Sequence, residues 1–233
     1  MQDELRSNLS CVARAAAVFA AAAVAAGAVF YTVLAEIRIH RNIDEGGLVE
    51  STQLALLGLA AVAFAVRALR DREMSRAFAL AALAVLGMCV REMDGYFDAW
   101  TGDHSFWAYV DAAVLAAMAA VVLRRFGRTA DHVARFVRTP SCLLFVAGVV
   151  FAVVVAQLIG YKEIWNNIFD VEIWQEAKAA HADPDGHLSV EFNIARHVKN
   201  TVEESLELAS YLMILGSAVL PPLLPRARGG DRG

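Results

Sequence analysis

The chain carries a series of predominantly apolar runs, each close to the length that crosses a lipid bilayer. An α-helix rises about 1.5 Å per residue, so about 20 apolar residues cover the roughly 30 Å of bilayer hydrocarbon. Such runs occupy residues 12–35, 48–66, 77–98, 105–123, 141–161 and 201–220. Apolar residues make up 58% of the 233-residue sequence, more than a soluble domain of this size encloses. The sequence therefore predicts an all-α, polytopic transmembrane bundle of about six spans.

The first apolar run resembles a signal peptide only superficially. Its apolar core is longer than the roughly 7 to 15 residues of a typical signal sequence, and further runs follow it. We expect it to be retained as a span. Without a recognisable soluble domain, residues 1–233 are expected to form a single integral membrane domain.

Arginines gather in alternate connections between the runs, and this pattern predicts the orientation of the chain. The second connection holds Arg67, Arg70, Arg72 and Arg76, the fourth holds Arg124, Arg125, Arg128, Arg135 and Arg138, and the tail holds Arg226, Arg228 and Arg232. Cytoplasmic loops of membrane proteins are enriched in arginine and lysine. An even number of spans with both termini in the cytoplasm places all these clusters inside. We therefore expect a multi-pass protein of the inner (plasma) membrane, with the acidic first, third and fifth connections outside.

The longest connection, residues 162–200, lies on the predicted outer side and has an amphipathic pattern. Ile164, Ile168 and Val171 follow one another at spacings of four and three, which places them on one face of a helix. Trp165 and Trp174 are suited to the headgroup level of a membrane. The sequence predicts an amphipathic helix here, which lies either at the membrane interface or over the outer mouth of the bundle.

Several carboxylates fall within the outer parts of the predicted spans. Asp111 lies about 9 Å down the fourth span from Ser105, too deep for its short side chain to reach water. Glu50 stands near the outer end of the second span. A polar stripe enters the last span at helical spacing, and its residues are Asn193, His197, Asn200, Glu204, Glu207 and Tyr211. A charged side chain exposed to lipid costs about 2.5 to 3.5 kcal/mol on insertion scales, so we expect these carboxylates to face the bundle interior.

These residues together predict a site in the outer part of the membrane. The candidate catalytic residues are Asp111, Glu204, Glu207 and His197. The same residue types suit zinc, manganese or iron. The candidate metal ligands are His104, His197, Glu50, Asp94, Asp111, Glu204 and Glu207. The sequence contains no HExxH, HxxxH or paired ExxH motif, and two alternatives stay open: a structural ion pair with Arg91, and solvated carboxylates at helix ends.

Different classes of function fit such a cluster. A metal-dependent hydrolase would use it to activate water against a lipid or another substrate of the outer leaflet. A proton- or cation-conducting transporter or channel would use it as a relay. A non-catalytic subunit would use it to pair with basic residues of a membrane complex. The inner halves of the spans are Ala, Val and Leu, which disfavours a continuous polar path through one protomer.

The expected partners are the lipid bilayer and other membrane proteins. Gly58, Gly87 and Gly148 offer small-residue faces for close helix packing, so a homo-oligomer, including an oligomeric pore, stays open. A net charge of −4 gives no basic footprint, and we expect no nucleic acid partner.

The arginine distribution predicts which connections an impermeant thiol reagent reaches in intact cells. A cysteine introduced at Asp103 or Asp183 should be labelled from outside, in a background without native cysteines. A cysteine at Arg72 or Arg128 should be protected until the membrane is permeabilised. Labelling at Arg72 in intact cells would reverse the predicted orientation.

Overall fold

The computed structural model describes the backbone of residues 2–40, 47–102, 105–161, 164–165 and 194–220. Side chains are described in these ranges except at residues 2–19, 40 and 194–197. The elements are α1 (Gln2–His40), α2 (Leu48–Arg70), α3 (Ser75–Glu92), α4 (Asp94–Thr101), α5 (Phe106–Arg124), α6 (Phe126–Val137), α7 (Pro140–Val150), the π-helix η1 (Phe151–Ala156), α8 (Gln157–Ile159) and α11 (Ile194–Val219). Every element in the described ranges is helical, which confirms the predicted all-α class.

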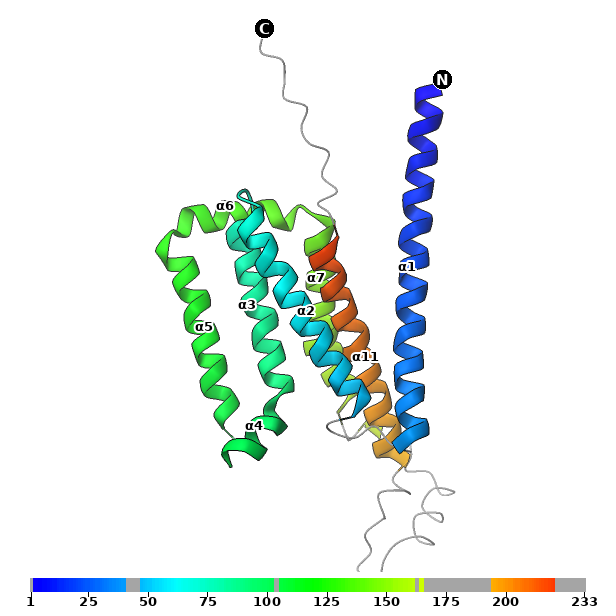
Figure 1. The fold of residues 1–233 in the computed structure, drawn as a ribbon, viewed down its shortest axis with the longest axis vertical. Helices are drawn as coiled ribbons and strands as arrows, with labels where there is room; N and C mark the ends of the chain where they lie inside the picture. Colours follow the sequence, from blue (N-terminus) through cyan, green and yellow to red (C-terminus); the bar gives the residue numbers. More distant parts are fainter. Residues whose placement is uncertain (1, 41–46, 103–104, 162–163, 166–193, 221–233) are drawn as a thin grey trace, which may run out of the picture.

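The long helices run alternately up and down the molecule (Figure 1). Between the α4 end and the α6 end of the bundle, α1, α3 and α7 run in one direction, and α2, α5 and α11 run in the other. The start of α1 and the end of α11 therefore lie toward the same end as α6. This alternation is what a chain that crosses a membrane repeatedly would have.

Within the described ranges, four helical stretches are long and apolar enough to cross a membrane. They are Ala20–Ile39, Leu48–Arg70, Phe106–Arg124 and Pro140–Ile159. The helices α3 and α11, which correspond to the other predicted spans, are not among them. Charged residues stand at both ends of α3 and in the first half of α11, and these lower the apolar character of the two helices.

The third helix ends earlier than the sequence predicts. We expected it to continue through Asp94 to Asp98, but α3 stops at Glu92, and Met93 separates it from α4. The N–H of Met93 donates to the carbonyl oxygen of Val90 at 3.1 Å, a tightened last turn. The short helix α4 then turns across the end of the bundle (Figure 1). The carboxylates that follow Glu92 therefore belong to a separate helix.

The fourth connection contains a helix, α6, where the sequence pattern indicated only a cluster of arginines. This helix lies across one end of the bundle (Figure 1). Its buried Phe136 contacts Phe78 of α3, with ring centroids 5.4 Å apart. Phe64 of α2 packs against Phe145 of α7 at the same centroid distance. Aromatic contacts thus join α6 to the core formed by α2, α3 and α7.

Arg67 ties together helices that are distant in the sequence. Its Nη1 lies 3.1 Å from the carbonyl oxygen of Ser217 and 3.3 Å from that of Ala218, in the last turn of α11. The same nitrogen donates to Ser141 Oγ at the start of α7. The guanidinium carbon lies 4.1 Å from the ring centroid of Phe78. Arg67 therefore satisfies carbonyls that the end of α11 leaves unpaired, in addition to its predicted role in orientation.

The helix α1 joins the bundle through its C-terminal part. Val33 and Glu36 are buried, whereas most described residues before them are exposed. The carboxylate of Glu36 accepts a hydrogen bond from the N–H of Val49, in the first turn of α2. The N-cap residue of α2, Gly47, has no side chain that could do this. A carboxylate from α1 therefore caps α2.

The helices α7 and α11 approach each other closely at Gly148. A Cβ atom at this position would lie 2.9 Å from the carbonyl oxygen of Ser210 and 2.8 Å from Cγ1 of Ile214. The first of these atoms belongs to the backbone, which cannot move aside without shifting α11. The absence of a side chain at Gly148 sets the distance between these two helices.

Replacing Gly148 by Ala should push α7 and α11 apart and destabilise the protein by about 1–3 kcal/mol, as overpacking does. Gly58→Ala is the matched control, because a Cβ at Gly58 meets nothing within 4 Å. That variant should be neutral or stabilising by up to about 1 kcal/mol, since alanine favours a helix. Thermal unfolding of both variants in detergent measures the difference. Equal midpoints would contradict the close approach.

Candidate functional site

Glu204 and Glu207 lie about one turn apart near the middle of α11. Gln53 of α2 donates from Nε2 to Glu204 Oε2 at 2.9 Å, and the same nitrogen lies 3.3 Å from the carbonyl oxygen of Glu204. Gln53 is completely buried, so this contact is held inside the helix packing. The contact between α2 and the polar stripe of α11 therefore involves an amide and a carboxylate.

Glu207 faces a different neighbour. Its Oε1 accepts a hydrogen bond of 3.0 Å from Nε2 of Gln157, at the start of α8. The carboxylate is buried, with 6% of the residue exposed. Gln157 was not among the predicted site residues, although it is the only amide in the predicted fifth span and could have been singled out on that ground.

One further turn along α11, Tyr211 extends the polar stripe to α3. Its hydroxyl donates to Glu92 Oε1 at 2.9 Å, and only 3% of Tyr211 is exposed. Glu50 of α2 interacts electrostatically with both Glu92 and Glu204. We call Glu50, Glu92, Glu204 and Glu207, with their partners Gln53, Gln157 and Tyr211, the carboxylate cluster.

The carboxylates of the cluster lie close enough to repel one another. Glu207 is repelled by Glu92 and Glu204 and attracted by Arg91. Arg91 itself is exposed. Lys199 is engaged one turn earlier on α11, where its Nζ lies 2.7 Å from Glu203 Oε2. Among the described residues, two amides and a phenol donate hydrogen bonds to Glu204, Glu207 and Glu92, and none of these donors carries a charge.

Other predicted site residues lie elsewhere. Asp111 of α5 faces α3, with its Oδ1 3.4 Å from the position of a Cβ at Gly87, and it is attracted by Arg91. This buried Oδ1 has no hydrogen-bond partner among the described residues. Asp94 is exposed at the start of α4, where its Oδ1 accepts from the N–H of Gly95. The structure thus groups Glu50, Glu204 and Glu207 and places Asp111 against another face of α3.

The two histidines of the predicted site cannot be placed against these carboxylates. His104 lies outside the described residues, and His197 is described only as part of the α11 backbone. Within the described part of the chain, no group of three or more His, Cys, Asp or Glu side chains is arranged to hold a metal ion. The predicted metal site therefore has no support in the described geometry.

The predicted amphipathic helix of the last connection falls almost entirely outside the described residues. Only Ile164 and Trp165 are placed, and Trp165 Nε1 donates to the carbonyl oxygen of Ile159 at the end of α8. Comparison of the chain with protein-family models, with curated proteins and with solved structures finds no match. The function is therefore inferred from the geometry of the chain itself.

Tyr211→Phe should destabilise the protein, because it removes the phenol that donates to the Glu92 carboxylate. Hydrogen bonds to charged groups contribute about 1.5–3 kcal/mol, and the loss should fall near the lower bound because Glu92 is only partly buried. Tyr109→Phe is the control, since Tyr109 is 67% exposed on α5. Thermal unfolding in detergent should separate the two variants. Indistinguishable midpoints would show that the Tyr211 contact does not hold α3 to α11.

Proposed function

We propose that the chain is an integral membrane protein with six spans, formed by α1, α2, α3, α5, the α7 to α8 run and α11. The alternating helix directions and the four apolar stretches support this arrangement. The two more polar helices, α3 and α11, pack against several other helices, so protein covers surface that would otherwise face lipid. The arginine-rich connections favour a cytoplasmic position for the α6 end and for both termini.

Within this bundle, we propose that the carboxylate cluster binds a proton or a small cation as part of cation-coupled transport. The observation that carries the proposal is the pairing of Glu204 and Glu207 with the neutral amides of Gln53 and Gln157. Neutral donors orient a carboxylate but do not cancel its charge. Neighbouring carboxylates do not all ionise in a low-dielectric interior without compensation, so the cluster favours a bound proton or cation.

Transport is favoured over metal-dependent hydrolysis by the choice of side chains. A hydrolytic zinc site needs three protein ligands around an open position, and the described residues hold no such group. The amide and phenol groups that donate to the carboxylate cluster are suited to carboxylates that bind and release protons. Elemental analysis of the purified protein separates the two functions, because stoichiometric bound zinc, manganese or iron would favour the enzyme.

Apolar side chains of α2 and α11 lie between the cluster and the α6 end. Leu57, Phe64 and Ile214 are fully buried between the level of Gln53 and the level of Arg67. These three apolar side chains lie between the cluster and the α6 end, and they oppose the passage of a cation. We propose that release toward the cytoplasm requires movement of α11 against α2 and α7.

Proton uptake into liposomes that contain the reconstituted protein and a pH-sensitive dye tests this function. Wild-type protein should carry protons down an imposed gradient, and Glu207→Gln should lose most of this flux while it inserts and purifies normally. Glu73→Gln is the matched control, because Glu73 is an exposed carboxylate outside the cluster. Equal flux in all three proteins, or no flux above empty liposomes for any tested cation, would contradict the proposal.

A further inference from the structure

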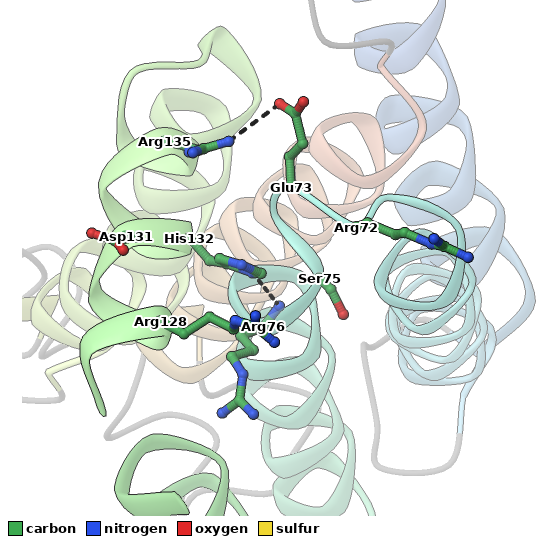
Figure 2. Close-up of a pocket in the computed structure, with 8 residues that line it drawn as sticks. All are labelled: Arg72, Glu73, Ser75, Arg76, Arg128, Asp131, His132 and Arg135. Atoms are coloured by element: carbon green, nitrogen blue, oxygen red, sulfur yellow. Dashed lines mark hydrogen bonds and ion pairs between the residues drawn. The ribbon is translucent and has the colours of Figure 1, made fainter. Parts of the chain in front are cut away.

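A second polar region lies at the opposite end of the bundle, between the start of α3 and the helix α6 (Figure 2). It is a pocket of about 730 Å³. We call it the basic pocket, and its charged or titratable lining residues are Arg72, Glu73, Arg76, Arg128, Asp131, His132 and Arg135. Four arginines face two carboxylates here, so the lining carries a net charge of two positive when His132 is neutral.

The arginines of the basic pocket are only partly engaged by the protein. Arg135 pairs with Glu73 at 3.5 Å, but both side chains are more than half exposed, and such pairs contribute little. Within the described residues, Arg72 and Arg128 make no hydrogen bond or ion pair. Their guanidinium groups are therefore available to a ligand.

Arg76 has a structural role that leaves donors free. Its Nη1 donates to the carbonyl oxygen of Val121 at 2.8 Å and to Thr129 Oγ1 at 3.1 Å. The first contact satisfies a carbonyl in the last turn of α5. A guanidinium has five N–H donors, so Arg76 keeps others for a ligand in the basic pocket.

His132 contributes a neutral donor to the same pocket. Its Nδ1 accepts a hydrogen bond of 3.2 Å from the backbone N–H of Arg76, in the first turn of α3 (Figure 2). The neutral ring then carries its proton on Nε2. Partial burial and the charges of Arg128, Arg135 and Arg76 lower the pKa of His132, against the opposing effect of Asp131. The positive charges of the arginines around His132 would therefore favour a bound anion.

The position of the basic pocket indicates which class of anion it is suited to bind. It lies at the arginine-rich end, which the sequence predicts to face the cytoplasmic headgroups. On α6, Phe126 is 68% exposed and Val137 is 61% exposed, as expected for a helix that rests at a membrane interface. We propose that the basic pocket binds a phosphate group, carried by an anionic lipid or by a soluble phosphate, through Arg72, Arg128 and Arg135. Planar guanidinium groups bind phosphate oxygens in bidentate pairs, and basic pockets between spans suit lipid phosphates.

Thermal unfolding of the full-length protein tests this proposal in two arms. In detergent, inorganic phosphate is titrated against chloride at matched ionic strength. In nanodiscs, phosphatidylcholine alone is compared with phosphatidylcholine plus phosphatidylglycerol. A ligand that binds the folded state raises the unfolding midpoint, and the rise grows with the logarithm of ligand concentration divided by the dissociation constant. The pocket variant is Arg128→Gln with Arg135→Gln, and the control is Arg70→Gln with Arg138→Gln, which removes two exposed arginines outside the pocket lining.

Wild type and control should be stabilised alike, and the pocket variant should bind roughly a hundredfold more weakly, because it loses two charge-assisted contacts. Stabilisation by phosphatidylglycerol but not by inorganic phosphate assigns the site to a lipid headgroup; stabilisation by inorganic phosphate extends it to soluble phosphates. Arg128→Gln alone replaces the double variant if the latter does not purify. The proposal is overturned if wild type responds in neither arm, or if the pocket variant responds as the control does.

Discussion

Helix ends inside an apolar environment carry unpaired backbone groups, and satisfying them organises this bundle. The helices α2 and α3 begin without a side-chain cap of their own, and Glu36 from α1 and His132 from α6 supply the acceptors. At the C-terminal ends of helices, Arg67 and Arg76 donate hydrogen bonds to carbonyl oxygens in the last turns of α11 and α5. Most of these contacts join helices that are distant in the chain, so the capping groups also help to determine which helices pack together.

The same constraint separates the polar groups into two layers of different chemistry. Near the α4 end, carboxylates of α3 and α11 accept hydrogen bonds from two amides and a phenol. Near the α6 end, arginines meet helix carbonyls and an open pocket. Buried apolar side chains such as Leu57 and Ile214 lie between the layers. The two proposed ligands follow this division: a proton or cation for the first layer, and an anion for the second.

Much of the carboxylate cluster could be predicted from the spacing of polar residues along one helix. Glu204, Glu207 and Tyr211 lie on one face of α11 because their spacings of three and four match the helical period. The hydrogen-bond partners of these residues could not be predicted, since nothing in the sequence tells which side chains face that stripe. Gln157 and Glu92 reach it only because α8 and α3 pack beside α11. The two histidines of the predicted site remain untested against this geometry, because the described side chains do not include them.

The sequence by itself determined the all-helical class and the approximate position of each long helix, because the length and period of apolar runs depend on local spacing alone. It also determined the separation of arginines from carboxylates along the chain. Only the tertiary structure decided how each helix is rotated about its axis. In the observed rotation, Asp111 faces Gly87 of α3, whereas Glu204 contacts α2 and Glu207 contacts α8. It likewise ended α3 at Glu92, where no glycine or proline marks a break. Rotation and register depend on contacts between helices, such as the close backbone approach at Gly148. The sequence of one helix does not specify which other helix it will contact.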